Sequence, residues 1–456
     1  MNVLRALSAL RWGASSHLLR NVYVAFIRSK LEYGSSVIGE LPSSSIKSLE
    51  SVQNSALRLI LGARRTSPIR SLEAESFLSP LHLRFRFLFM KRCLRYAYSP
   101  TQAILPGLLG IDPISAQINN LHPFATHARY LFQSMGIAMP RQVRTPAFSP
   151  IPPWISLHNQ ICLDPSGGLA LPHRDSSFST ILAYRMDQFY SGHIPIYTDG
   201  SRSEAGSVSA GVYIPLLSAA TGWLLSPSHS VMGAELFAIY KALQMTLSLV
   251  ELQNRQVVIF TDSKSSLHLI LNTRHPTYAA IVYRIHALLL QRGLNSVAFC
   301  WVKGHSGVFG NEVADRIASL AHSSDRSSCS ILSFDESYGQ LAQAFNSHWR
   351  AYWQTQVAAT GCGQFRYNLD GCITYIDYSS LTRSLQCAVA RLRLGHAGVG
   401  AHRARFGMAA TGVCPECQVD DTIAHFILHC ARFSGPRAIF RSAVNAQGLT
   451  WGLQTA

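Results

Sequence analysis

The sequence predicts an α/β fold for its middle part, in which a five-stranded mixed sheet is flanked by helices. Three observations predict it. Strand-length apolar runs alternate with longer segments of helical periodicity over residues 194–322. Acidic residues stand directly after two of the apolar runs, and a further acid lies inside an apolar helix pattern. The segments on both sides of this region show helical periodicity instead.

The expected elements of this α/β region follow one another in a simple order. The first strand covers about 194–199, and 206–215 and 220–227 continue it as an antiparallel meander. A long helix is expected at about 232–250 and a fourth strand at 257–262. Two helices (264–272 and 277–292), a fifth strand (296–302) and a last helix from Asn311 complete the region.

The flanking regions divide the remaining chain into four further parts. Residues 1–98 are predicted to form basic helices, because apolar residues recur at helical spacing and Arg58, Arg64, Arg65 and Arg70 line the other faces. Residues 99–193 are rich in Pro, Ser and His and are expected to be a partly ordered linker. A helical connector is expected over 323–411, and a small metal-binding unit with a tail over 412–456.

Size and charge limit the functions that the chain can have. Its 456 residues suffice for two to four domains. The formal net charge is +16, and residues 1–100 hold 15 Lys and Arg against 5 Asp and Glu, whereas 194–322 hold 9 against 7. The basic N-terminal helices are therefore expected to bind the phosphate backbone of nucleic acid. The alternative is a basic surface without a dedicated partner.

Several other classes are disfavoured by the sequence. No apolar run approaches the length of a membrane span, so no membrane partner is expected. The acid-free first 31 residues superficially suit a mitochondrial transit peptide, but their apolar pattern favours a basic helix of a folded domain. Most of the ten cysteines are scattered, which indicates a reducing compartment. No feature selects nucleus or cytoplasm, and none identifies a protein partner.

Four carboxylates are the candidate catalytic residues. They lie in IPIYTDGS (Asp199), MGAELFAIYKAL (Glu235), VVIFTDSKS (Asp262) and GNEVADRIASLA (Asp315). Carboxylates are costly to bring together unless cations neutralise them, and hard divalent ions prefer oxygen ligands. The pattern therefore predicts a pair of divalent ions that assist the hydrolysis of a phosphodiester. Taken singly, each acid has an ordinary explanation as a turn, cap, helix-terminal or ion-paired residue.

Residues 194–322 resemble a ribonuclease H domain, in which the four acids and His305, in the loop VKGHSGVFG, fall on motif positions. The resemblance implies two Mg²⁺ ions, for which Mn²⁺ can substitute. Asp199 would bridge both ions, Asp315 would complete one, and Glu235 and Asp262 would hold the other. His305 would transfer a proton or assist product release. Asn311 is interpreted as the N-cap of the last helix.

The substrate that this resemblance implies is the RNA strand of an RNA–DNA hybrid, read with low sequence specificity. The chain departs from the bacterial form of the family in one respect. The segment LNTRHPTYAA (271–280) has no cluster of Lys and Trp that could serve as a basic handle. Affinity for the hybrid is therefore expected to come from the basic helices of residues 1–98, or to be weak.

A second candidate metal site lies near the C-terminus. The cysteine and histidine spacing C-x2-C-x7-H-x4-C predicts a closed, structural Zn²⁺ site formed by Cys414, Cys417, His425 and Cys430. Five positions separate His425 from Cys430 in an expected helix, so both reach one face only if the last turn loosens. His429 is therefore a competing fourth ligand. The alternative is that the cysteines lie together by chance, beside a core histidine, and bind no metal.

The order of these parts resembles the C-terminal portion of a non-LTR retrotransposon reverse transcriptase polyprotein. Residues 6–94 resemble the thumb or connection helices that follow the polymerase palm, and the cysteine/histidine cluster resembles the motif near the C-terminus of such polyproteins. No paired aspartates precede residue 194, so the chain is not expected to polymerise DNA. The alternatives are an inactive nucleic-acid-binding remnant and a polynucleotidyl transferase or transposase of the same fold.

Overall fold

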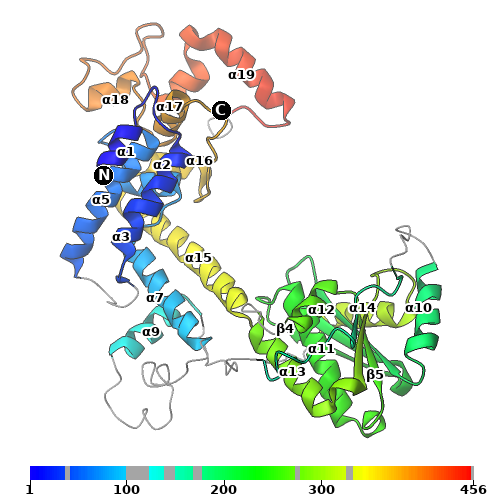
Figure 1. Ribbon diagram of the computed structural model, residues 1–456. Coiled ribbons are helices and arrows are strands. Elements are labelled where there is room, and N and C mark those ends of the chain that lie inside the picture. Colours follow the sequence, from blue (N-terminus) through cyan, green and yellow to red (C-terminus); the bar gives the residue numbers. More distant parts are fainter. Residues whose placement is uncertain are drawn as a thin grey trace. The chain divides into compact units, whose positions relative to one another are not determined.

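The computed structural model of the protein describes residues 1–35, 42–98, 123–137, 149–167, 177–272, 278–324 and 332–452 (Figure 1). The chain forms two compact units. Unit 1 comprises residues 1–90, 130–137 and 343–456, and unit 2 comprises 91–129 and 138–342. None of the helices in the described part combines the length and the hydropathy that a bilayer crossing needs.

Unit 2 contains a mixed sheet with the strand order β1-β6-β5-β2-β3-β4. The strands are β1 (Ile161–Cys162), β2 (Ile194–Arg202), β3 (Val208–Ile214), β4 (Ala219–Leu225), β5 (Val257–Thr261) and β6 (Val297–Trp301). β2, β3 and β4 form the antiparallel meander, while β2, β5, β6 and β1 run parallel. The mixed sheet is confirmed, but the expected number of five strands is wrong. A two-residue strand such as β1, in the segment expected to be a linker, is too short to show periodicity in the sequence.

Helices cover both faces of this sheet (Figure 1). α11 (Val231–Ser248), α12 (Lys264–Leu271) and α13 (Ala279–Arg292) pack on the face that presents Ile196, Ile259 and Phe299. α10 (Ser177–Phe189) packs on the opposite face, against Phe260. α14 (Phe309–Ala321) covers β3, where the Ser209 hydroxyl donates to the Ala318 carbonyl over 2.6 Å. Short 3₁₀ turns lie at Pro215–Leu217, Val250–Leu252 and Leu294–Ser296.

Gly200 allows α11 to approach the central strand β2 closely. A Cβ atom at this position would lie 2.5 Å from the backbone nitrogen of Glu235 and 2.9 Å from the carbonyl carbon of Ala234. Both are backbone atoms, so a side chain would displace the helix. The glycine of the TDGS segment therefore brings the first turns of α11 against the end of β2.

A glutamate from the expected connector fixes the N-terminus of α11. Glu336, in the first turn of α15 (Phe334–Thr360), accepts hydrogen bonds from the backbone N–H of Ser230 (2.8 Å) and from that of Ser333 (2.7 Å). The Ser230 hydroxyl donates to the same carboxylate over 2.6 Å and accepts from the Gly233 N–H as the N-cap of α11. The start of α15 therefore belongs structurally to unit 2.

Unit 1 is helical. Its N-terminal helices are α1 (Asn2–Leu7), α2 (Ser16–Val22), a π-helix (Tyr23–Arg28), α3 (Ser29–Glu32), α5 (Ser43–Leu61), α6 (Ile69–Ser76) and most of α7 (Leu81–Ala97). The rest of the unit contains the end of α9 (Pro123–Ser134), the C-terminal part of α15, α16 (Gln364–Asp370), α17 (Arg383–Arg393), α18 (Gly400–Arg405) and α19 (Ser434–Ala446). One core joins the two ends of the chain, because Leu57 and Ile60 of α5 pack with Ala390 and Leu394.

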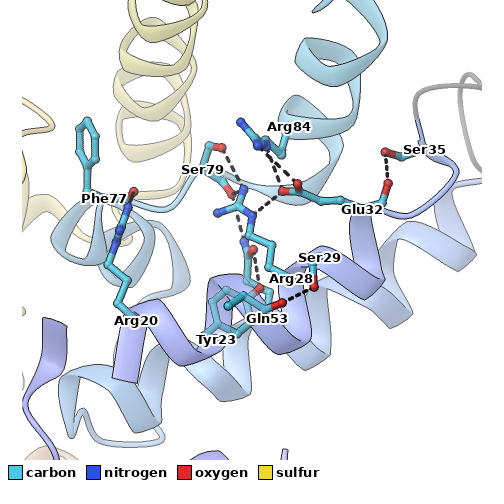
Figure 2. A network of polar contacts seen from close by, with 11 residues as sticks. Arg20, Tyr23, Arg28, Ser29, Glu32, Ser35, Gln53, Phe77, Ser79 and Arg84 are labelled. Carbon is cyan, nitrogen blue, oxygen red and sulfur yellow. Dashed lines mark hydrogen bonds and ion pairs between the residues drawn. The ribbon is translucent and has the colours of Figure 1, made fainter. Parts of the chain in front are cut away.

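Several arginines of the basic N-terminal region are engaged inside unit 1 (Figure 2). The buried Arg28 binds the Glu32 carboxylate at 2.8 Å and donates to the Ser79 carbonyl. Arg84 contacts the same carboxylate at 2.9 Å, and Arg20 donates to the backbone carbonyl of Ser76. These cations stabilise the packing of α2, α3 and α7, so only part of the basic excess remains for a phosphate backbone.

Candidate active site and candidate zinc centre

Two parallel strands bring Asp199 and Asp262 to the same edge of the sheet. Thr198 of β2 pairs with Thr261 of β5. Asp199 is the next residue of β2, and Asp262 directly follows the end of β5. Glu235 reaches this edge from α11, where its carboxylate accepts a hydrogen bond of 3.4 Å from the Thr261 hydroxyl. Carboxylate oxygens of the three acids all lie within 4.8 Å of one another.

The three carboxylates repel one another in a buried setting. Burial, followed by the charges of Asp262 and Asp315, raises the pKa of Asp199 to about 7. Burial and the charges of Asp199 and Asp262 raise the pKa of Glu235 well above its ordinary value, and the pKa of Asp262 is also raised, chiefly by burial. Asp199 and Glu235 are only 6% and 5% exposed. Burial and mutual repulsion therefore disfavour the ionised form of all three groups, and the nearby His305 offsets this effect at Asp262.

The donor set fits a hard divalent ion. Mg²⁺ prefers oxygen ligands and retains waters, and three convergent carboxylates with one partly exposed side supply both conditions. Asp199, Glu235 and Asp262 would hold such an ion. Binding a cation would favour the ionised carboxylates, which burial and mutual repulsion disfavour.

Asp315 lies outside this close group but within electrostatic reach of it. It stands on α14 and its side chain is 37% exposed. Its charge contributes to the raised pKa of both Asp199 and Asp262. Of the four candidate carboxylates, three therefore converge and the fourth flanks them.

His305 is the most exposed of the candidate residues. Its side chain is 85% exposed, and its Nδ1 lies 3.8 Å from a carboxylate oxygen of Asp315. The residue has a left-handed backbone, with φ of 51°, in the loop before α14. His305 is thus placed beside Asp315 and open to solvent, where it can meet a substrate.

Asn311 has a different role from the one that the sequence predicts. α14 begins at Phe309 with Val308 as its N-cap, so the interpretation of Asn311 as the cap is wrong. Asn311 is 3% exposed, and a hydrogen bond from its side chain counteracts the raised pKa of Asp262. The four-residue spacing between Asn311 and Asp315 places both on one face of α14, a signal that could have identified it.

The four candidate zinc ligands of unit 1 also converge. One ligand atom each from Cys414, Cys417, His425 and Cys430 lies within 4.8 Å of the others. The Cys414 Sγ and Cys430 Sγ atoms are 3.8 Å apart, and a backbone N–H bond from Cys417 contributes most to lowering the pKa of the Cys414 thiol to about 7. The buried Nε2 of His425 has no hydrogen-bond partner among the described residues. Three thiols and one free imidazole nitrogen are the donor set of a structural zinc site.

A π-helix decides which histidine joins the cysteines. His425–His429 forms one π-helical turn, and the Cys430 N–H donates to the His425 carbonyl over 2.7 Å. This wider turn is the loosening that the five-residue spacing requires. His429 is not part of the group of converging ligand atoms.

The α/β region of unit 2 matches a known family of proteins. A family model described as RNase H matches residues 192–323. Among solved structures, LC11-RNase H1, isolated from compost by a metagenomic approach, has 21% sequence identity, and the match covers 28% of this chain and 95% of that chain with a TM-score of 0.25. No curated protein matches the chain. Residues 192–323, which carry the converging carboxylates, are an RNase H domain.

Proposed function

We propose that the protein is a metal-dependent endonuclease that hydrolyses the RNA strand of RNA–DNA hybrids. The observation that carries the proposal is the convergence of Asp199, Glu235 and Asp262 within 4.8 Å at one edge of the sheet. The match of the surrounding domain to the RNase H family supports it, because that family acts on such hybrids. Structural acids are normally paired with cations or solvated, whereas Asp199 and Glu235 are almost fully buried beside another carboxylate.

The residues of the site have separable roles in this proposal. Bound Mg²⁺ ions would lower the pKa of the attacking water and stabilise the charge of the leaving oxygen. Asp199, Glu235 and Asp262 hold the cation, and Asn311 orients the Asp262 carboxylate by its hydrogen bond. Asp315 adds negative charge beside the group and positions His305, whose exposed imidazole gives or accepts a proton at the scissile phosphate.

Substrate affinity needs a source outside the carboxylate group. Part of the segment proposed to lack a basic handle, residues 273–277, lies outside the described residues. We propose that cations of unit 1 that are not engaged internally contribute to the binding of nucleic acid, with low sequence specificity.

We further propose that this domain works within a non-LTR retrotransposon polyprotein. The support is the order of a basic helical region, the RNase H domain and a cysteine/histidine cluster in one chain. A genomic sequence in which the same reading frame also encodes a polymerase palm would support this context.

The deciding experiment compares four substrates of the same sequence: an RNA–DNA hybrid, single-stranded RNA, duplex RNA and duplex DNA. The label is on the RNA strand in the first three substrates and on one DNA strand in the fourth. We expect cleavage of the RNA strand in the hybrid only, and only when Mg²⁺ or Mn²⁺ is added. Cleavage of duplex DNA instead would support the transposase alternative. Binding of the hybrid without cleavage under all metal conditions would support the inactive remnant.

We also propose that the cysteine/histidine cluster binds a structural Zn²⁺ ion. Elemental analysis of the purified chain should find about one zinc per chain, and Cys417→Ser should lose most of it, because three ligands hold the ion far more weakly than four. The control is Cys362→Ser, since Cys362 is exposed and lies outside the cluster. Equal zinc content in Cys417→Ser and wild type would contradict the assignment.

A further inference from the structure

Two histidines and two arginines of unit 1 converge beside α18. The rings of His396 and His402 are 4.8 Å apart between centroids, at an interplanar angle of 68°. The guanidinium of Arg64 packs against Gly398, which lies between the two histidines in the sequence. A Cβ atom at Gly398 would lie only 2.9 Å from the Arg64 Nη2. The charges of Arg64 and Arg405 both act on the two rings. Segments more than 300 residues apart in the sequence thus build one cationic group.

Two buried nitrogens of this group have no hydrogen-bond partner. His402 is 7% exposed, and its Nε2 has no partner among the described residues. The Nε of Arg64 is likewise buried and without a partner in the part of the chain that the structure describes. His396, in contrast, is bonded through Nδ1 to the Thr66 hydroxyl over 3.0 Å. Buried polar atoms are rarely left unpaired. The Arg64 Nε–H therefore lacks an acceptor, and the His402 Nε2 lacks one as well when it carries the proton.

The two arginines beside these rings favour an anionic acceptor. Burial, followed by the charges of His402, Arg405 and Arg64, lowers the pKa of His396 to about 4, and burial and the two arginines also lower the pKa of His402. The carboxylate of Asp421 is directed to the backbone N–H of Gly400 at the start of α18. A negatively charged ligand would offset the charges of the two arginines, favour protonation of the neighbouring imidazoles and accept a hydrogen bond from the Arg64 Nε–H.

The surroundings of the group indicate what kind of anion it takes. Arg65 and Arg403 are exposed on the same two segments, which extends the positive surface. Phe406 is 39% exposed, lies 4.8 Å from the His402 ring between centroids and is covered by the Arg405 guanidinium at 5.5 Å. A phosphate-binding group next to an accessible aromatic ring is the arrangement that binds single-stranded nucleic acid, because bases stack on the ring while cations hold the backbone.

We propose that Arg64, His402 and Arg405 form a phosphate-binding site for single-stranded nucleic acid, in which Phe406 receives a neighbouring base. The site lies in unit 1 and shares no residue with the carboxylate group of unit 2. It rests on the proposal that free cations of unit 1 bind nucleic acid and names their site, and it does not depend on the nuclease activity of unit 2.

The test measures binding of a fluorescently labelled single-stranded DNA oligonucleotide to the full chain by anisotropy, over a range of salt concentrations. Zn²⁺ is kept in the buffer and Mg²⁺ is left out, so that the nuclease plays no part. We expect the double variant Arg64→Ala/Arg405→Ala to bind about tenfold more weakly, and the slope of log K against log salt to fall by about 1.4, or ~0.7 for each lost phosphate contact. The comparison variant is Arg350→Ala/Arg441→Ala, which removes two exposed arginines of the same unit. As general contributors to the positive surface, they should weaken binding clearly less than the site variant does.

A second measurement uses the unaltered protein and so does not depend on the folding of a variant. Adding the oligonucleotide should shift the Nε2 resonance of His402, assigned with His402→Gln, in ¹⁵N spectra of the histidine rings. An unmoved resonance at saturating oligonucleotide, or equal affinity and salt slope in the two double variants, would overturn the proposal. A shift caused by inorganic phosphate but not by the oligonucleotide would also overturn it, because the site would then serve a small anion.

Discussion

Asp199→Asn is expected to lower the rate of hybrid cleavage by on the order of 10³-fold and, at the same time, to stabilise the Mg²⁺-free protein. Asp199 converges with the two other carboxylates of the site, and its amide analogue cannot supply the charge that a divalent ion requires. The same charge is unfavourable when no cation is bound. Removing it should therefore raise the stability of the folded unit 2.

The pH dependence of stability has a definite sign. The folded pKa of Asp199 is about 7, raised from 3.8 by burial and by Asp262 and Asp315, so the folded state binds this proton more tightly than the unfolded state. The resulting stability is complete below about pH 3.8 and is lost as the pH rises through about 7. At pH 8 the asparagine variant should be more stable than the wild type by on the order of 2 kcal/mol. Mg²⁺ should stabilise the wild type at this pH and leave the variant nearly unchanged.

Calorimetry of the full chain can check this prediction. The unfolding transition whose temperature Mg²⁺ changes in the wild type is assigned to unit 2. The matched control is Asp187→Asn, which removes the same charge from an exposed position on α10. Cleavage by Asp199→Asn at the wild-type rate would contradict the catalytic assignment. Lower stability of the variant without Mg²⁺ would contradict the repulsive cluster.

The sequence could predict the carboxylate site because its determinants are local. Asp199 lies within a strand that apolar periodicity reveals, and Asp262 directly follows another. Because these two strands are parallel neighbours, the two aspartates come close together. The cysteine/histidine cluster was predictable for the same reason, since C-x2-C and a nearby histidine and cysteine lie within one short segment. What the pattern could not show was how far Asp315 stands from the other three acids, because that depends on the packing of α14.

The features that the sequence could not predict rest on contacts between distant segments. β1 is too short to leave a pattern, and its pairing with β6 joins residues more than 130 positions apart. The basic character of residues 1–98 predicted a phosphate-binding face, but Arg28 and Arg84 instead share the Glu32 carboxylate inside unit 1. Composition counts charges and does not tell which of them are paired within the fold.

Glu336 is the most consequential of these long-range contacts, and Glu336→Ala is expected to destabilise unit 2 by about 2–4 kcal/mol. Its side chain is 6% exposed, and its carboxylate accepts the backbone N–H groups of Ser230 and Ser333 and lies 3.5 Å from His229 Nδ1. Removing the carboxylate would leave the Ser230 N–H unpaired at the N-terminus of α11, the helix that carries Glu235, and the Ser333 N–H unpaired directly before α15. Hybrid cleavage should fall with the stability, because Glu235 would lose part of its support.

The pH dependence of this contribution has the opposite sign to that of Asp199. Burial alone would raise the pKa of Glu336, but hydrogen bonds from His229, Ser230 and Ser333 outweigh it and lower the pKa to about 2, from 4.5. Its contribution to stability is therefore complete above about pH 4.5 and is lost as the pH falls through about 2.

Calorimetry between pH 4 and 8 should show the Mg²⁺-shifted transition of Glu336→Ala displaced to lower temperature throughout. The neighbouring Asp335→Ala removes the same charge from an exposed position of α15 and should leave that transition within about 0.5 kcal/mol of the wild type. Equal destabilisation by the two variants would show that helix charge, and not the buried hydrogen bonds of Glu336, stabilises the start of α11.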